Sequence, residues 1–281
     1  MEVLSTTLAM TNLSVYNFIM KNIVTVCFDS EMQAAIATQF ANKNELTIKD
    51  IVNASTPFVL HYKNNFVELI DQQEQTRIHV DFITGTLAHR RKYGGGKGQA
   101  IAKAIGIKNY KLPLTILDIT AGLAKDAFVL ACLGCSVTMI ERHPIIAELV
   151  KNALFHAKTD ESFQIIKQQG FNLIKADALH YLKNISNKRS TIKPDVIYMD
   201  PMYPERKKSA SVKKSMQMLQ KLICFDSNKV SDETSLLTQA LMVAQKRVVV
   251  KRPKGAPTLT DKAPTMCIES KITRYDVYVL T

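Results

Sequence analysis

The 281-residue sequence predicts an α/β fold in which a mostly parallel sheet is covered by helices on both faces. Two observations support this fold class. From about residue 114, short apolar runs alternate with segments of helical periodicity, which is typical of βαβ units. Several of the runs end in a carboxylate, at the edge where doubly wound sheets bind ligands. The predicted strands span residues 115–119, 136–141, 171–176, 196–199, 247–250, 266–269 and 274–280, the last two as an antiparallel edge hairpin.

The helices predicted between these strands follow from apolar spacing and from punctuating residues. Gly134 ends the helix that begins at Lys125, and Pro144 suits the first turn of the next one. The complete set of predicted helices in this part of the chain is 125–133, 144–157, 209–223 and 232–244.

Residues 1–80 predict a small α+β subdomain without catalytic signals of its own. A strand at 24–28 and a helix at 32–41 precede two strands, 58–62 and 66–70, which Lys63-Asn64-Asn65 joins as a hairpin. A further strand is expected at 77–83. Residues 81–113 then form a basic, glycine-rich connecting segment, and 114–281 form the main domain.

A net charge of +12 indicates a polyanionic partner. The excess is concentrated in residues 82–117, 201–225 and 246–254, which favours a nucleic acid over a small substrate. A solvated basic surface is the alternative.

The five scattered cysteines are expected to be reduced, which fits a cytoplasmic protein. Cys132 and Cys135 form a C-x-x-C without a second pair, so no metal site is predicted. Residues 3–20 are uncharged but polar, and no membrane span is predicted.

Four consecutive strand ends carry an acid: Asp118, Glu141, Asp177 and Asp200. Gly122 lets the backbone approach a ligand after the first of these strands. Glu141 is placed to accept hydrogen bonds from ribose hydroxyls, and Asp177 from an adenine amino group. Taken singly, each acid has a structural alternative as a strand-end cap, an ion-pair partner or a helix N-cap. Together they match S-adenosylmethionine, whereas the absence of G-x-G-x-x-G disfavours a dinucleotide-dependent oxidoreductase.

The sequence Asp200-Pro201-Met202-Tyr203-Pro204 follows the strand at 196–199. Enzymes that methylate an exocyclic amine of a nucleobase present their catalytic residues in this way. Asp200 and the carbonyl of Pro201 would accept the two amine protons, and Tyr203 would stack on the base. Because adenine and DNA amine methylation share the motif, they stay open as alternatives. A non-catalytic RNA-binding or assembly factor is a further alternative.

Residues 89–98 combine glycines with Arg and Lys immediately before the first strand of the main domain. The spacing does not match a P-loop, so nucleotide hydrolysis is rejected. Backbone N–H groups and basic side chains here are expected to contact RNA phosphate or cofactor, a flexible hinge being the alternative. The basic residues predicted to bind RNA are Arg90, Arg91, Lys92, Lys97, Lys207, Lys208, Lys213, Lys251 and Arg252.

From about Arg77 to the C-terminus the chain resembles the bacterial small-subunit (16S) rRNA guanine-N2 methyltransferases, the RsmJ family. The motifs that carry the resemblance are Val80-Asp81-Phe82, Ala88-His89-Arg90-Arg91-Lys92-Tyr93-Gly94-Gly95-Gly96, Thr120-Ala121-Gly122-Leu123, Asp126-Ala127-Phe128-Val129-Leu130-Ala131, Glu141-Arg142, Asp200-Pro201-Met202-Tyr203-Pro204, Lys207-Lys208-Ser209-Ala210, Val212-Lys213-Lys214 and Val249-Val250-Lys251-Arg252-Pro253. The resemblance implies a class I, Rossmann-like methyltransferase that uses S-adenosylmethionine to produce N2-methylguanosine in 16S rRNA or the small ribosomal subunit.

The resemblance also implies cofactor contacts at Lys125, Asp126, Glu141, Arg142, Asp177, Ala178 and Asp200. Two positions depart from the family pattern. Lys125 stands where the family usually has Arg, which keeps the charge but loses bidentate geometry. Asp177-Ala178 stands where the family usually has two serines, so Ala178 would contribute only backbone.

Overall fold

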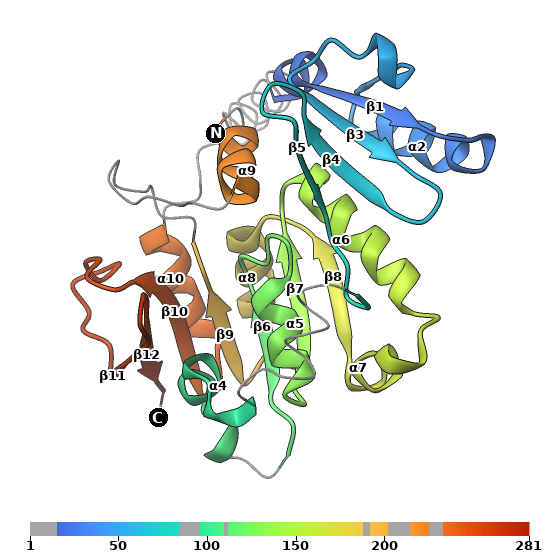
Figure 1. The fold of residues 1–281 in the computed structure, drawn as a ribbon. Coiled ribbons are helices and arrows are strands. Elements are labelled where there is room, and N and C mark those ends of the chain that lie inside the picture. The colour runs from blue at the N-terminus through green and yellow to red at the C-terminus, as the bar shows by residue number, and fades with distance from the viewer. Residues whose placement is uncertain are drawn as a thin grey trace. The chain divides into compact units, whose positions relative to one another are not determined.

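The computed structural model describes residues 16–84, 96–109, 112–187, 192–201, 214–224 and 233–280 (Figure 1). The chain divides into two compact units. The first comprises residues 1–80 and 205–230, and the second comprises residues 81–204 and 231–281. Of residues 205–230, the structure describes 214–224, which form a helix of the first unit.

The first unit is built on a five-stranded sheet in the order β2-β1-β3-β4-β5. Its strands are β1 (Val24–Phe28), β2 (Thr47–Ile48), β3 (Phe58–Tyr62), β4 (Val67–Asp71) and β5 (Thr76–His79). Strand β1 runs parallel to β2 and β3, whereas β4 is antiparallel to both β3 and β5. The predicted hairpin is therefore confirmed, and the strand expected at 77–83 is shorter than predicted.

Helices complete the first unit. Residues 16–23 are helical, and helix α2 (Glu31–Lys43) follows β1; a 3-10 turn, η1, spans Ile51–Asn53. Helix α9 (Lys214–Cys224) comes from a distant part of the sequence and packs against β5. On α9, Lys221 Nζ lies 3.4 Å from Asp71 Oδ2 and 3.1 Å from Glu74 Oε1, so one lysine joins the helix to the turn after β4.

The second unit contains a seven-stranded sheet in the order β11-β12-β10-β9-β6-β7-β8. The strands are β6 (Thr115–Asp118), β7 (Ser136–Glu141), β8 (Phe171–Lys175), β9 (Val196–Met199), β10 (Arg247–Pro253), β11 (Met266–Glu269) and β12 (Thr273–Val279). The five strands from β8 to β10 are parallel, and β12 is antiparallel to β10 and β11. The predicted sheet and its edge hairpin are confirmed.

The order of the strands reverses between β6 and β9. The chain proceeds from β6 to β7 and β8 on one side and resumes with β9 and β10 on the other. Ligands of doubly wound sheets bind beyond the carboxyl ends of the strands at such a switch point.

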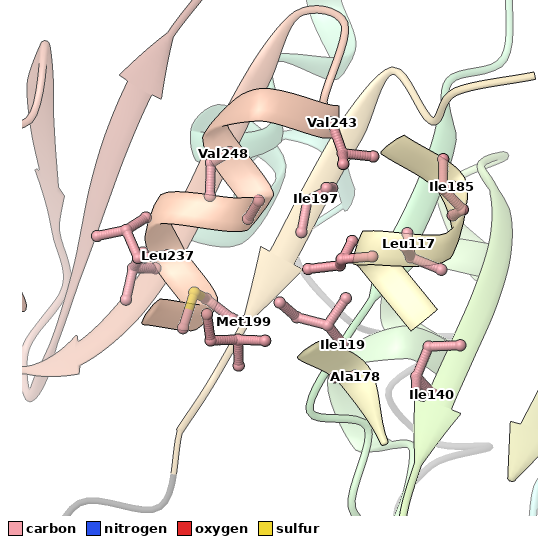
Figure 2. Close-up of a cluster of buried hydrophobic side chains, with 14 of the residues drawn as sticks. Leu117, Ile119, Ile140, Ala178, Ile185, Ile197, Met199, Leu237, Val243 and Val248 are labelled. Atoms are coloured by element: carbon pink, nitrogen blue, oxygen red, sulfur yellow. The ribbon is translucent and has the colours of Figure 1, made fainter. Parts of the chain in front are cut away.

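Helices cover both faces of this sheet. Helices α8 (Ala178–Asn187) and α10 (Glu233–Val243) bury apolar side chains against alternate residues of β6, β9 and β10, including Leu117, Ile197 and Val248 (Figure 2). Tyr198 points to the opposite face, because successive strand residues alternate, and there it meets Asp126 of α5 (Lys125–Cys132). Because both faces of the sheet are covered, the sequences of its central strands are continuous apolar runs.

The remaining helices are α4 (Ala100–Ile105), α6 (Pro144–Ala157) and α7 (Gln164–Gln169), with 3-10 turns at Gly96–Gly98, Ile107–Asn109 and Glu161–Phe163. Helix α4 lies in the predicted connecting segment and packs on β10, β11 and β12. Its C-terminus ends at Gly106, whose φ of +78° favours glycine. Arg247 Nη1 donates to the carbonyl of Ala104 at 3.0 Å and so fixes this end to β10.

Within the described ranges, no helix is both long and apolar enough to cross a membrane, and no cluster of His, Cys, Asp or Glu forms a metal site.

Candidate active site

Acidic residues gather at the carboxyl edge of the second sheet, on both sides of the switch point. Asp118 ends β6, Glu141 ends β7 and Asp200 directly follows β9. These strands are neighbours in the order β9-β6-β7. The sequence prediction that these acids meet at one edge is therefore confirmed for the three of them.

Backbone N–H groups hold Glu141, among them those of Gly122 and His143. Gly122 N donates to Oε2 at 2.9 Å, and His143 N donates to Oε1 at 2.7 Å. The side chain is buried, and burial raises the pKa of Glu141 despite these bonds. A carboxylate has about four acceptor positions. The acceptor capacity that remains beyond these backbone bonds suits the hydroxyls of a ribose.

Gly122 owes its identity to backbone conformation. Its φ is +52°, a region that glycine enters without strain. This conformation turns its N–H toward Glu141 and joins the loop after β6 to the end of β7. Ala124, two residues later, also has a positive φ, of 58°, and precedes the first turn of α5.

Asp118 is the most buried acid of the edge, with 2% of its surface exposed. Burial raises its pKa to about 8; the N–H of Thr120 opposes the shift, and the charges of Asp126, Asp200 and Glu141 add to it. The charges of Asp126, Asp200 and Glu141 thus act on Asp118. At neutral pH the edge favours a cationic ligand and holds a proton on Asp118.

Asp200 is joined to Asp126 through one lysine. Lys251 Nζ, from β10, donates to Oδ2 of Asp200 and to Oδ2 of Asp126, each at 2.7 Å. The hydroxyl of Tyr198 also donates to Asp126 Oδ2 at 2.7 Å. We call the four residues Tyr198, Asp126, Lys251 and Asp200 the lysine-centred cluster.

The other oxygen of Asp200, Oδ1, receives no hydrogen bond from any described residue, and 40% of this side chain is exposed. The backbone N–H of Asp200 donates to Thr120 Oγ1 at 2.6 Å, which joins the ends of β9 and β6 across the switch point. Asp200 is thus fixed at its backbone and at Oδ2, while Oδ1 has no hydrogen-bond partner within the part of the chain that the structure describes.

Asp177 and Ala178 lie where β8 passes into α8. Asp177 Oδ1 accepts from His180 N at 2.9 Å, as expected of a helix N-cap. The residue is exposed, whereas Ala178 belongs to the apolar core. The predicted adenine contact of Asp177 is compatible with this geometry, because its other oxygen is not used in the cap. Lys125 is exposed at the start of α5, and Arg142 is half-buried beside Glu141.

The described basic residues have three different environments. Lys97 is exposed in the turn Gly96–Gly98, as predicted for a phosphate contact. Lys251 belongs to the lysine-centred cluster. Arg252 is 3% exposed, lies 3.5 Å from Glu233 Oε2 and donates to the carbonyl of Pro257 at 3.1 Å, which gives it a structural role instead of the predicted RNA contact.

Pro201 is described and half-buried directly after Asp200. The other predicted residues lie outside the described part of the chain; they are Tyr203, Arg90, Arg91, Lys92, Lys207, Lys208 and Lys213.

Sequence reasoning missed three contributors to the site: Thr120, Tyr198 and the role of Lys251. Tyr198 offered a signal, since it is the one polar side chain within the apolar run of β9. Thr120 lies two residues after Asp118, and its sequence position alone does not indicate that its hydroxyl contacts Asp200. The partners of Lys251 depend on strand order, which the sequence does not reveal.

The hydrogen-bond acceptors and charges of this edge fit S-adenosylmethionine. This cofactor presents ribose hydroxyls, an adenine amino group and two cationic centres, the ammonium and the sulfonium. The edge offers hydrogen-bond acceptors at Glu141, Asp177 and Asp200 and an excess of carboxylates over ammonium groups. Both hydrogen bonding and charge therefore match the cofactor predicted from the sequence.

Comparisons with known proteins agree with this chemistry. The family described as putative SAM-dependent methyltransferase matches residues 39–280. Proteins called ribosomal RNA small subunit methyltransferase J are 46% identical in Tolumonas auensis, over 81% of this chain and 88% of the relative, and 43% identical in Vibrio parahaemolyticus, over 90% and 96%.

Among solved structures, a SAM-dependent methyltransferase from Neisseria gonorrhoeae superimposes with a TM-score of 0.69 at 30% identity, covering 91% of this chain and 95% of that one. The sheet order, the strand-end acids and these similarities together show that the chain belongs to the SAM-dependent methyltransferases, in the family of ribosomal RNA small subunit methyltransferase J.

Proposed function

We propose that this enzyme transfers a methyl group from S-adenosylmethionine to the exocyclic N2 amine of a guanosine in 16S rRNA, as part of the small ribosomal subunit in the cytoplasm. The observation that carries the proposal is the position of Asp200. It lies at the switch point beside the end of β6, with Oδ2 held by Lys251 and Oδ1 without a hydrogen bond from any residue that the structure describes. The names of the relatives support ribosomal RNA as the substrate.

The guanine amine is a poor nucleophile because its lone pair is delocalised into the ring. Two acceptors, Asp200 Oδ1 and the carbonyl of Pro201, would each take one N–H hydrogen bond and favour a tetrahedral nitrogen. S-adenosylmethionine supplies an electrophilic methyl group. The N–C bond would form as the S–C bond of the cofactor breaks, and Asp200 would accept the amine proton late in the reaction.

Positioning provides most of the remaining acceleration, since alignment of the reacting atoms removes much of the entropic barrier. In the proposal, Tyr203 stacks on the guanine and contributes about 1–3 kcal/mol. If the guanine is paired or stacked in the RNA, its release costs a few kcal/mol. The exposed Lys97 and the predicted residues at 90–92, 207–208 and 213 would neutralise phosphates around the site.

The proposed cofactor contacts use the acids at the strand ends. Glu141 would accept hydrogen bonds from the ribose hydroxyls, and Asp177 would accept one from the adenine amine. The backbone of the loop at Gly122 would come close to the cofactor. Asp126 supplies negative charge toward the cationic amino-acid tail, whereas Asp118, protonated at neutral pH, would contribute a neutral carboxyl group. Lys125 and Ala178, at the first turns of α5 and α8, and Arg142, directly after β7, would complete the predicted contacts.

The test is nucleoside analysis of methylated RNA. Small subunits from a strain that lacks this enzyme are incubated with the purified protein and isotope-labelled S-adenosylmethionine, then digested and analysed by mass spectrometry. Labelled N2-methylguanosine is the expected product, and subunits from the parent strain should accept little label.

Other products decide between the alternatives. Labelled N6-methyladenosine, or transfer to DNA in a parallel reaction, would replace guanine by adenine or RNA by DNA in the proposal. Absence of transfer to any RNA by a protein that binds the cofactor would favour the non-catalytic assembly factor and overturn the proposal.

A further inference from the structure

Lys251 lies in a basic stretch of sequence, yet its ammonium contacts carboxylates of its own chain. It stands on β10 and is 25% exposed. Its two carboxylate partners come from α5 and from the end of β9. A lysine that serves only as a phosphate contact would be expected to extend into solvent, as Lys97 does.

We propose that Lys251 is a positioning residue for Asp200: its ammonium, anchored on Asp126, orients the Asp200 carboxylate so that Oδ1 meets the substrate amine. This inference rests on the proposed function, since it assigns the residue that prepares the proposed catalytic carboxylate. It excludes a primary role for Lys251 in phosphate binding.

Asp126 and Tyr198 anchor the ammonium group of Lys251. Asp126 lies in the first turn of α5, and its Oδ2 accepts from both Tyr198 OH and Lys251 Nζ at 2.7 Å. Tyr198 is completely buried in β9, so its hydroxyl has little freedom. The ammonium is consequently fixed before it reaches Asp200, and the Asp200 side chain is held at Oδ2 instead of rotating in solvent.

Lysine chemistry suits this task. An ammonium carries three donors on a compact charge, so it can bond to two carboxylate oxygens on different elements at once. The planar fork of an arginine matches two oxygens of a single carboxylate better. An arginine here would keep the charge but change the angle between the two bonds.

The same contacts control the ionisation of Asp200. Burial and the negative charge of Asp126 raise the pKa of Asp200, while the charge and hydrogen bond of Lys251 lower it. The other titratable groups of the edge are Asp118 of β6, Glu141 of β7 and Tyr198 of β9, with Tyr275 of β12 near Tyr198. Lys251 ion-pairs with Asp126 and Asp200, whereas the charge of Arg142 acts on Glu141. Removal of Lys251 should therefore leave Asp200 protonated over a wider pH range.

The kinetic test compares Lys251→Met and Lys251→Arg with the wild type, using unmodified small subunits. Lys251→Met is expected to lower kcat at pH 7 by about tenfold, a fraction of the full effect of a catalytic acid or base, with KM for the subunit within about twofold of the wild type. The acid limb of its kcat–pH profile should move to higher pH, so that part of the activity returns on raising the pH. Lys251→Arg should recover part of the loss and restore the limb.

Lys151→Met provides the matched control. Lys151 lies on the surface of α6 in the same unit, and pairs with Glu148 at 3.5 Å. The control makes the same change of charge without touching the site, and its kcat–pH profile should match that of the wild type.

A second readout does not depend on catalysis. The ionisation of Asp200 is followed by carbon NMR of its carboxyl group, assigned by comparison with Asp200→Asn, in wild type and Lys251→Met. The apparent pKa is expected to be higher in the variant. If this shift is found while the wild type does not make N2-methylguanosine, the proposed function fails and the role of Lys251 stands.

Two results would overturn the inference. The first is an unchanged kcat with a raised KM and a shallower salt dependence of RNA binding, which would make Lys251 a phosphate contact. The second is a lowered kcat without any movement of the acid limb or of the Asp200 titration, which would make the lysine merely structural.

Discussion

Two lysines in this chain each join two carboxylates, and they do so in different units. Lys221 in the first unit ties α9 to Asp71 and Glu74 at 3.4 and 3.1 Å. Lys251 in the second unit ties β10 to Asp126 and Asp200, both at 2.7 Å. Both residues fall in basic segments of the sequence, although RNA binding was predicted for Lys251 alone of the two.

Their surroundings differ. Lys221 is 41% exposed, and its hydrogen bonds to Glu74 and Asp71 raise its pKa at the surface. Lys251 is 25% exposed; burial opposes its charge, yet Asp126 and Asp200 raise its pKa. Beyond these partners lie Asp118 and Glu141, whose own pKa values burial raises. The same ion-pair chemistry fastens a helix in one place and organises a charged edge in the other.

The largest expected effect is at the acid partner of Lys251. Asp200→Asn keeps the shape but removes the negative acceptor, so kcat should fall by roughly 100-fold or more. Affinity for S-adenosylmethionine, measured by isothermal titration, should change only a few-fold. Glu74→Gln makes the equivalent change beside Lys221 and should leave turnover intact. Wild-type turnover by Asp200→Asn would remove the distinction between the two bridges.

Glu141→Gln tests whether the charged edge extends to the cofactor. Glutamine has one acceptor oxygen, so its NH2 group would face either the N–H of Gly122 or that of His143. Loss of hydrogen bonds from a charged acceptor should weaken cofactor affinity by about 10- to 100-fold. Isothermal titration measures this directly, and unchanged affinity would place the ribose elsewhere.

Stability should separate the two lysines. Lys251→Met leaves Asp126 and Asp200 close together without their shared cation, which is expected to cost about 1–2 kcal/mol of unfolding free energy. Lys221→Met removes a solvent-screened pair and should cost less. Urea denaturation of both variants gives the comparison, and equal losses would show that the two environments are energetically equivalent.

The raised pKa of Asp118 predicts how the free energy of unfolding changes with pH. Its pKa is about 8 in the folded protein and near its ordinary value of 3.8 when unfolded. Between these values the folded state binds a proton that the unfolded chain has lost, so stability falls as the pH rises through this window, by up to about 1.4 kcal/mol per pH unit.

Asp118→Asn should flatten this part of the stability curve. Thermal or urea unfolding of wild type and variant between pH 5 and about 9 checks the difference. If the two curves remain parallel, Asp118 is ionised at neutral pH and the edge is more polar than its burial indicates.

The smallest expected effect concerns RNA binding. Lys97 is exposed, so Lys97→Ala should reduce the slope of log affinity against log salt by about one. Arg252 is buried on Glu233 and the carbonyl of Pro257, so Arg252→Lys should leave the slope unchanged. A reduced slope for Arg252→Lys would return this residue to the RNA-binding surface.

Much of the fold was predictable because its signals are local. Strands β7 and β9 and helix α6 have the predicted bounds, since each is an apolar run or stripe limited by a turn residue. Helices α4, α7 and α8 are not in the predicted set. Helices α4 and α7 are short, and α4 is stabilised by packing on β10, β11 and β12, which its own six residues do not reveal.

The site was predictable where it depends on strand ends and not where it depends on strand order. Asp118, Glu141 and Asp200 meet as expected. The contact between Lys251 and Asp126 joins residues 125 positions apart, through a parallel pairing of β10 with β9 that no periodicity specifies. Arg252, next to Lys251 in sequence, points to the other face of the strand and is buried.

The central claim is that cofactor and substrate amine meet beside Asp200 at the edge formed by β6, β7 and β9. A crystal structure with bound S-adenosylhomocysteine tests it most directly. We expect both ribose hydroxyls within hydrogen-bond distance of Glu141 and the sulfur facing the side of the edge that carries Asp200. A ribose bound away from Glu141, or a sulfur separated from Asp200 by a strand of the sheet, would contradict it.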